Sequence, residues 1–243
     1  MAVIVRAARL KSITQAWRLA ADGSMLAGSR ARTAMTFREP LLNPVPISAL
    51  RPTQITVGFR EVQQKRQEWR DRARARADGE KAAEFLGTHM IPVVRGPKDR
   101  HYVLDHHHLC RALHEEGVVD ILVNVVADLS RLSKSSLWAY LDNRGWCHPY
   151  DAQGERRPFE DIPSSIGKMT DDPYRSLAGE LRRAGGFAKD TTPFSEFIWA
   201  DYLRRRIKPK LLADNFDEAL KRALALSAGR DADYLPGWCG PTI

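Results

Sequence analysis

The stretch HYVLDHHHLCRAL, residues 101–113, decides the predicted fold, because its hydrophobic pattern changes from that of a strand to that of a helix at an aspartate. Up to Asp105 the side chains alternate, as the two-residue period of a strand requires. Beyond it, Leu109, Ala112 and Leu113 mark the apolar side of a helix. We therefore expect a short buried strand that runs directly into a helix, with Asp105 at the junction.

Groups that carry protons or positive charge follow this junction. His107, Arg111 and His114 have the spacing i, i+4, i+7, which predicts that they share one side of the helix. The first turn of a helix has free backbone N–H groups, which favour an anion. The simpler alternative is an N-capping Asp105 followed by surface histidines, but three consecutive histidines behind an aspartate favour a functional site.

Composition bounds the class of protein. The chain has 243 residues, of which 43% are hydrophobic, so it can form one large domain or a domain with a helical annex. It has no run of about 18 apolar residues, so no membrane span is predicted. Its three cysteines are scattered and form no CxxC pair, which indicates the reducing cytoplasm. The net charge of +8 is compatible with a nucleotide or nucleic acid partner and does not by itself establish one.

The hydrophobic pattern divides the chain into three regions: a basic, weakly ordered arm at 1–42, a compact core at 43–143, and a loop and helical portion at 144–243. In the core we expect, in order, an edge strand around Val45 and Ile47, a turn at 56–58, a helix from Phe59 to about Ala77, a short helix at 80–86, a hairpin at 90–104, a helix at 106–116, a strand at 120–127 and a helix at 133–143. Residues 146–173 are predicted to be a loop without strands, and helices are expected to begin near Asp172, Thr192 and Asn215. The predicted fold class is therefore α+β, a small mixed sheet with helices followed by an all-helical C-terminal portion.

This order of elements resembles the ParB/sulfiredoxin-like superfamily, and within it the branch of ParB-like nucleases. The residues that carry the resemblance are PISALRPTQ at 46–54, IPVVRG at 91–96, VLDHHHLCRAL at 103–113, DPYRSLAG at 172–179 and FSEF at 194–197. The motifs are short, so the resemblance depends on their order, and it spans most of residues 43–240.

The resemblance implies a nucleotide or phosphate cleft at the strand-to-helix junction. Relatives include partition proteins that hydrolyse CTP, sulfiredoxins that use ATP, and kinases of free serine. The Asp-Gly-His-His-Arg pattern of those kinases is similar to residues 105–108 here, with His106 in place of the glycine that allows close phosphate approach. The catalytic cysteine of sulfiredoxins has no counterpart, because Cys110 falls on the buried side of the helix. The Gly-Glu-Arg-Arg pattern of partition proteins occurs only at 154–157, in a proline-rich loop with no preceding strand, and we interpret it as coincidence.

A carboxylate beside a phosphate implies Mg²⁺ binding or general-base catalysis, and this is the role expected of Asp105. His107 and His108 are expected to act with it as acid or base, since a helix N-terminus lowers a histidine pKa, and Glu61 is the candidate second carboxylate. The expected phosphate- or nucleotide-binding residues are His106, Arg111, Arg95, Arg51, Thr53 and Gln54. The expected cofactors are Mg²⁺ and a nucleoside triphosphate. Zinc is not expected, because three adjacent helical residues point about 100° apart and do not share one metal.

Two classes of function follow, with a third between them. The first is an enzyme of phosphate-ester chemistry, that is, a nuclease, a nucleotidase or a small-molecule kinase. The alternative is a non-enzymatic, partition-like protein that binds nucleotide or DNA, which would need a helix-turn-helix after the core, whereas the predicted linker at 185–193 is too long for one. A pseudoenzyme that binds a nucleotide for regulation is the third, and Asp105→Asn separates it from the enzyme, because only an enzyme would lose turnover.

Overall fold

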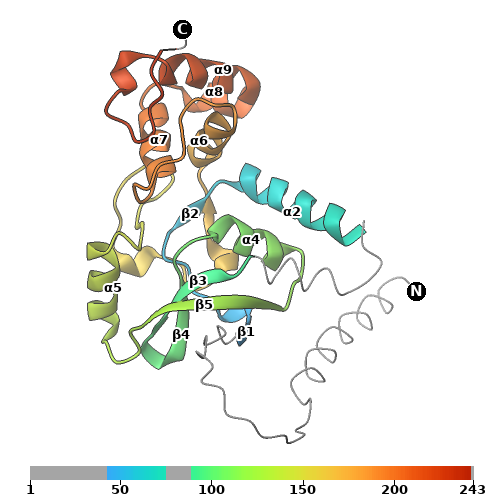
Figure 1. The fold of residues 1–243 in the computed structure, drawn as a ribbon, viewed down its shortest axis with the longest axis vertical. Helices are drawn as coiled ribbons and strands as arrows, with labels where there is room; N and C mark the ends of the chain where they lie inside the picture. The colour runs from blue at the N-terminus through green and yellow to red at the C-terminus, as the bar shows by residue number, and fades with distance from the viewer. Residues whose placement is uncertain (1–42, 75–88, 242–243) are drawn as a thin grey trace, which may run out of the picture.

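The computed structural model describes residues 43–74 and 89–241 of the chain (Figure 1). The predicted basic arm at 1–42 and the predicted short helix at 80–86 lie outside the described residues. None of the described helices has both the length and the hydrophobicity needed to cross a membrane.

A four-stranded mixed sheet forms the centre of the core, with the strand order β1-β5-β3-β4. The edge strand β1 (Asn43–Pro46) runs antiparallel to β5 (Asp120–Asp128), and β5 runs parallel to β3 (Ile91–Gly96). β3 and β4 (Arg100–Val103) form the predicted antiparallel hairpin. Two prolines fit β1 because a strand at the edge of a sheet tolerates lost N–H groups. The prediction of an α+β fold with a small mixed sheet is confirmed.

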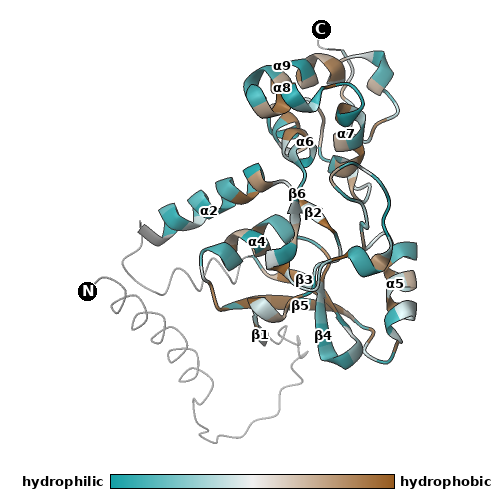
Figure 2. Ribbon diagram, turned by 180° about the vertical axis from the view of Figure 1, so that it is seen from behind, coloured by the Kyte–Doolittle hydropathy of each residue, from teal (hydrophilic) through white to brown (hydrophobic). Residues whose placement is uncertain are grey.

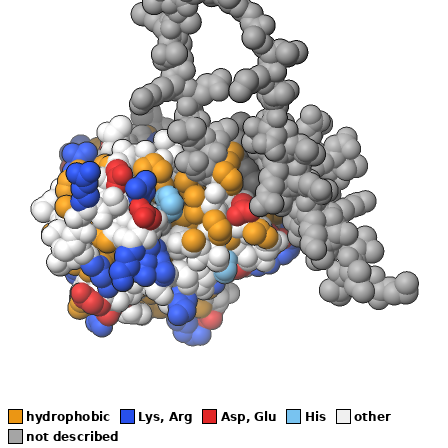
Figure 3. All heavy atoms as spheres, turned by 90° about the horizontal axis from the view of Figure 1, so that it is seen from below, with side chains coloured by type: hydrophobic (Ala, Val, Ile, Leu, Met, Phe, Trp, Pro, Cys, Tyr) orange, Lys and Arg blue, Asp and Glu red, His pale blue; other side chains and the backbone are white. Residues whose placement is uncertain are grey.

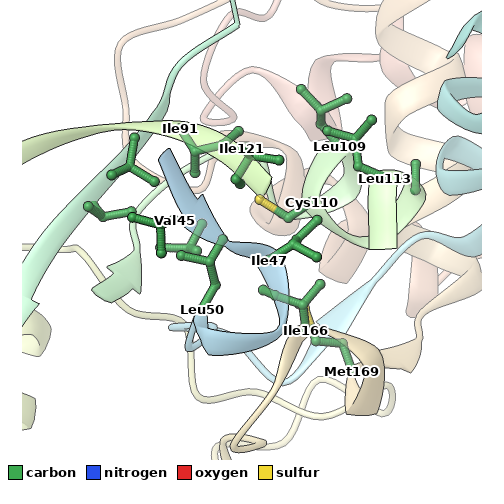
Figure 4. Packing of buried hydrophobic residues seen from close by; sticks show 14 of the residues in the cluster. Val45, Ile47, Leu50, Ile91, Leu109, Cys110, Leu113, Ile121, Ile166 and Met169 are labelled. Carbon is green, nitrogen blue, oxygen red and sulfur yellow. The ribbon is translucent and has the colours of Figure 1, made fainter. Parts of the chain in front are cut away.

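Helices cover both faces of this sheet. α2 (Phe59–Arg74) and α4 (His107–Glu115) pack on one face, and α5 (Lys134–Asn143) packs on the other. Successive residues of β3 point to the two sides, so Val93 packs toward α4 and Val94 toward α5. Figure 4 shows side chains of β1, β3 and β5 meeting those of α4 and of the segment at 166–169.

The predicted helix from Phe59 is only thinly apolar, and the structure agrees with this. Figure 2 shows α2 as largely hydrophilic along its length, with hydrophobic residues at the end beside β2 (Thr56–Val57). Val62 is buried near that end, and farther along the helix Arg66 and Arg70 pair with Glu116 at the end of α4 at 2.6 and 2.7 Å. An apolar end, Trp69 farther along the helix and a row of ion pairs therefore hold α2 against the core.

The C-terminal portion consists of α6 (Pro173–Arg183), α7 (Ser195–Arg204), α8 (Pro209–Asp214) and α9 (Phe216–Ser227). These helices surround a hydrophobic cluster of their own, in which the rings of Phe187 and Trp199 stack with centroids 4.5 Å apart. Figure 1 shows them gathered at the end of the molecule away from the sheet. α6 and α9 begin beside Asp172 and Asn215 as predicted, and these residues cap them. α7 begins at Ser195, three residues after the expected Thr192, and the short helix α8 was not predicted.

Two predictions about local structure are wrong. Residues Thr56–Val57 were expected to form a turn, but they form the strand β2, which pairs in parallel with β6 (Thr170–Asp171) inside the segment predicted to lack strands. β6 leads directly into α6, so this small sheet brings α6 against the start of α2. The approach is close at Gly58, where a Cβ atom would lie 2.5 Å from Ser176 Oγ.

Candidate functional site

A cavity of about 590 Å³ lies between the strand-to-helix junction and the C-terminal helices. The core contributes residues 104–109 together with Gln54, Glu61 and Lys65. The loop after α5 contributes Gly145 and Trp146, and α6 with the segment before and within α7 supplies the rest: Arg175, Arg182, Lys189, Asp190 and residues 192–197. The predicted junction therefore forms one wall of a cavity that the helical portion completes.

Asp105 lies in this wall with an exposed side chain, and its Oδ1 accepts a hydrogen bond from the His106 N–H at 2.6 Å. His106 is the N-cap of α4 and has left-handed backbone angles, with φ of 64° and no capping side chain. A non-glycine residue in this conformation costs about 1–2 kcal/mol. The backbone thus keeps the conformation that glycine favours, although the residue is histidine.

The two histidines that follow are buried and accept backbone hydrogen bonds. His107 Nε2 accepts the Thr53 N–H at 3.2 Å, and His108 Nε2 accepts the Gly58 N–H at 2.9 Å. Burial lowers the pKa of His107 to about 3, and burial also places the pKa of His108 well below its usual value, helped by Arg175. Both rings are therefore neutral near pH 7, and their acceptor nitrogens hold the 53–58 segment in place. This geometry favours a structural role for both rings over the predicted catalytic one.

Glu61 belongs to a buried group of charges that joins three helices. Its Oε2 lies 3.5 Å from Arg175 Nη1 of α6 and 3.6 Å from His108 Nε2. Arg175 also pairs with Glu196 in the first turn of α7, and Glu196 Oε1 lies 2.8 Å from Arg182 Nε. Glu61, the predicted second carboxylate, is therefore already paired with an arginine. It lines the cavity but is not a free base.

Sequence reasoning did not identify Arg175, Arg182 and Glu196 as functional residues. Arg175 could have been identified from the sequence, because it falls on the same side of α6 as Tyr174 and Ala178. An arginine on a buried side of a helix needs buried partners. Its side chain is only 8% exposed.

Two predicted phosphate ligands face away from the cavity. Arg111 Nη1 donates to the Met169 carbonyl at 2.8 Å, and Arg111 Nε pairs with Glu115. Arg51 donates to the carbonyl of Ser164. Both guanidinium groups fasten the 164–169 segment to the core, so neither lines the site.

The remaining predicted ligands divide into two that line the cavity and two that do not. Arg95 pairs with Asp99 at 2.9 Å at the far end of the hairpin. Thr53 lies behind the cavity wall, where its Oγ1 donates to the Val103 carbonyl at 2.6 Å. Gln54 lines the cavity, as does His106.

Charge in the lining is balanced, and this limits the ligands that fit. Four cationic side chains and four carboxylates face the space: Lys65, Arg175, Arg182, Lys189, Glu61, Asp105, Asp190 and Glu196. Among residues 43–74 and 89–241 no three His, Cys, Asp or Glu side chains gather as a metal cluster. The protein groups alone therefore do not fit a Mg²⁺ site, and such an ion would need phosphate oxygens as ligands.

Together, the fold and the cavity define an α+β protein with a polar site at the junction of β4 and α4. The chain belongs to the family described as "Putative ParB-like nuclease", whose model matches residues 43–205. The predicted resemblance to that branch is confirmed. Protein Atu1540 from Agrobacterium tumefaciens, known from a crystal structure, is similar to this chain with 53% identity and a TM-score of 0.76, over 84% of this chain and 100% of that one. No curated protein matches the chain.

Proposed function

We propose that the protein cleaves or transfers a phosphate ester of a nucleotide or nucleic acid in this cavity, with Asp105 as the general base. One observation carries the proposal: Asp105 is an exposed carboxylate in the cavity wall that forms no ion pair with any other described residue. The other three carboxylates of the lining each have a partner, since Glu61 and Glu196 pair with arginines and Asp190 binds Thr192. Membership of the ParB-like nuclease family supports the same class of chemistry.

The first turn of α4 provides the anion-binding element of this proposal. His107, His108 and Leu109 are its first three residues, and the side chain of the N-cap residue His106 forms no capping hydrogen bond to them. Free N–H groups and the positive end of the helix dipole favour a phosphate at this point. Lys65 and Arg182 lie in the same cavity and would neutralise the phosphate charge.

The proposed step is a displacement at phosphorus. The oxygen of a water molecule or substrate hydroxyl bonds to phosphorus, the bond from phosphorus to the leaving oxygen breaks, and Asp105 accepts the proton of the attacking group. The Asp105 carboxylate is suited to this because its hydrogen bond from His106 fixes Oδ1 at the start of α4. Mg²⁺ would supply further charge neutralisation if it entered the cavity together with the phosphate.

The balanced lining favours a monophosphate or a phosphodiester over a nucleoside triphosphate. A triphosphate would add three or four negative charges to a wall in which cations and carboxylates already match. We therefore place hydrolysis of a nucleotide or nucleic acid ahead of kinase chemistry.

Partition-like DNA binding is less well supported. Residues 184–194 separate α6 from α7, whereas a helix-turn-helix needs a turn of about three to four residues. Positive side chains are also not confined to one track, since Figure 3 shows Lys and Arg groups with acidic neighbours on the face opposite the C-terminal helices.

Turnover of nucleoside monophosphates and of single- and double-stranded DNA by Asp105→Asn tests the proposal. We expect a loss of about 10²- to 10⁴-fold in turnover, because a general base contributes that much, with little change in melting temperature. Asp99→Asn is the matched control: it removes an exposed carboxylate from the far end of the same hairpin, and it should retain activity. Full activity of Asp105→Asn would contradict the proposal, and binding without turnover in the wild-type protein would favour the regulatory alternative.

A further inference from the structure

The cavity has an apolar side that the proposed phosphate chemistry does not use. Leu104 and Trp146 line it and pack against the same hydrophobic cluster beneath α5. Pro193 lines it as well and approaches the same loop, since a Cβ atom at Gly145 would lie 3.5 Å from the Pro193 Cβ. Most of the charged lining comes from α2 and α6, with Glu61, Lys65, Arg175 and Arg182, while Lys189 and Asp190 come from the segment that also holds Pro193. The cavity is therefore two-sided, with Asp105 next to Leu104 at the boundary.

Trp146 is held as an aromatic platform on this side. The guanidinium of Arg144 lies 4.8 Å from the centroid of its ring, and the Tyr140 ring meets it at 69° with centroids 6.0 Å apart. These neighbours fix the indole while it still lines the cavity. A fixed aromatic ring of this kind stacks well with a planar ligand.

Gln54 offers an acceptor beside that platform. Its side chain lines the cavity in a residue that is only 5% exposed, and Gln54 bridges in parallel to His148, two residues beyond Trp146. Its Nε2 donates to the Thr56 carbonyl at 2.7 Å, which fixes the orientation of the amide because a carbonyl only accepts. Among the described residues nothing donates to the remaining oxygen, Oε1. Because Gln54 lines the open cavity, this oxygen is available to accept a hydrogen bond from a donor on a ligand.

From these observations we infer that the apolar side is a nucleobase subsite, in which the base stacks on Trp146 and an exocyclic amino group donates to Gln54 Oε1. The inference rests on the proposed function and narrows its substrate class. The substrate is a mononucleotide or an unpaired nucleotide of a strand, with a base that carries an exocyclic amino group: adenine, cytosine or guanine. The size of the cavity agrees with such a substrate, because about 590 Å³ accommodates one nucleotide and excludes a duplex.

Dissociation constants for AMP, IMP, adenosine and ribose 5-phosphate, measured by titration calorimetry on the full chain, test this inference. We expect AMP to bind about 30-fold more tightly than ribose 5-phosphate, which lacks the base, and about tenfold more tightly than IMP, which replaces the amino group by a carbonyl. CMP and UMP form a second pair with the same expected order.

Variants assign these differences to the two residues. Trp146→Ala should bind AMP no better than ribose 5-phosphate, and Trp146→Phe should keep most of the preference. Gln54→Leu should bind AMP and IMP equally. Tyr234→Ala removes an aromatic residue that is 70% exposed outside the cavity, and it should behave as the wild type. Melting temperatures confirm that each variant is folded.

The same affinities distinguish a failure of the base subsite from a failure of the proposed phosphate site. Equal affinity of the wild type for AMP and ribose 5-phosphate would overturn the base subsite while the phosphate site stands. Binding of adenosine as tight as that of AMP would overturn the phosphate site and keep the base subsite. If none of the four binds, both proposals are wrong.

Discussion

The starts of α4 and α7 both line the cavity, and they differ in what they leave open. Each begins at a non-glycine residue with left-handed backbone angles and no capping side chain: His106, with φ of 64°, and Phe194, with φ of 58°. The first turn of α7 contains Glu196, which is already paired with two arginines, whereas the first turn of α4 contains no acid. The dipole of α7 is therefore satisfied from within the protein, and only α4 offers its amides to an external anion.

Breaking the charge group at the start of α7 should have the largest effect on stability. Arg175→Met leaves Glu61 and Glu196, whose side chains are 12% and 17% exposed, without this cation, so we expect the free energy of unfolding to fall by about 3 kcal/mol or more. Urea unfolding measures this loss. Arg205→Met is the control, because Arg205, the C-cap of α7, is 72% exposed and among the described residues pairs only with Asp201, so the change should cost less than about 1 kcal/mol. Equal losses in the two variants would show that the buried group contributes no more than a surface pair.

The start of α4 should instead respond to pH through the buried His107. Its pKa is about 3 in the folded protein and about 6.5 in the unfolded chain, so below pH 6.5 the unfolded chain binds the additional proton. Its contribution to stability is complete above pH 6.5 and is lost as the pH falls toward 3, amounting to about 2 kcal/mol by pH 5.

Urea unfolding of wild type and His107→Gln between pH 5 and 7 measures this contribution. Glutamine keeps an acceptor for the Thr53 N–H but does not titrate, so the variant should lose part of the pH dependence. An unchanged slope in His107→Gln would exclude His107 as its source, and His106→Gln serves as the exposed control.

The smallest expected effect comes from glycine at the two helix starts, where the free energy of unfolding should change in opposite directions. His106→Gly removes strain at an exposed residue and should stabilise the protein by about 0.5–1 kcal/mol. Phe194→Gly relieves the same strain but removes ring contacts with His148 and Phe197, at centroid distances of 4.9 and 5.9 Å, so it should destabilise by about 1–2 kcal/mol. Changes of the same sign in urea unfolding would contradict this difference between the two starts.

The sequence predicts the core well where the signal is local. The hairpin, the junction at Asp105 and the cap of α5 at Ser133 follow from alternation, helical spacing and capping chemistry within a few residues. β2 and β6 were missed because each has two residues and finds its partner more than a hundred residues away. No local pattern encodes such a pairing.

The site is predictable only in part, for the same reason. Asp105 and Gln54 line the cavity as residues of the predicted site should, but Arg111 does not, because the 164–169 segment folds over it and accepts its hydrogen bonds. His107 was expected on a polar side of its helix, yet the 53–58 segment buries it. The opposite wall, with Arg175, depends on the contact between α6 and α2, which nothing in the sequence of either helix specifies.

The central claim is that a phosphate binds at the first turn of α4 and not at that of α7, and backbone amide NMR tests it most directly. Titration of the ¹⁵N-labelled full chain with AMP should shift the amide signals of His107, His108 and Leu109, with smaller changes at Ser195 and Glu196. Asp99→Asn should give the same pattern as the wild type. Shifts confined to the α7 amides, or no shifts at the start of α4 at saturating AMP, would contradict the account.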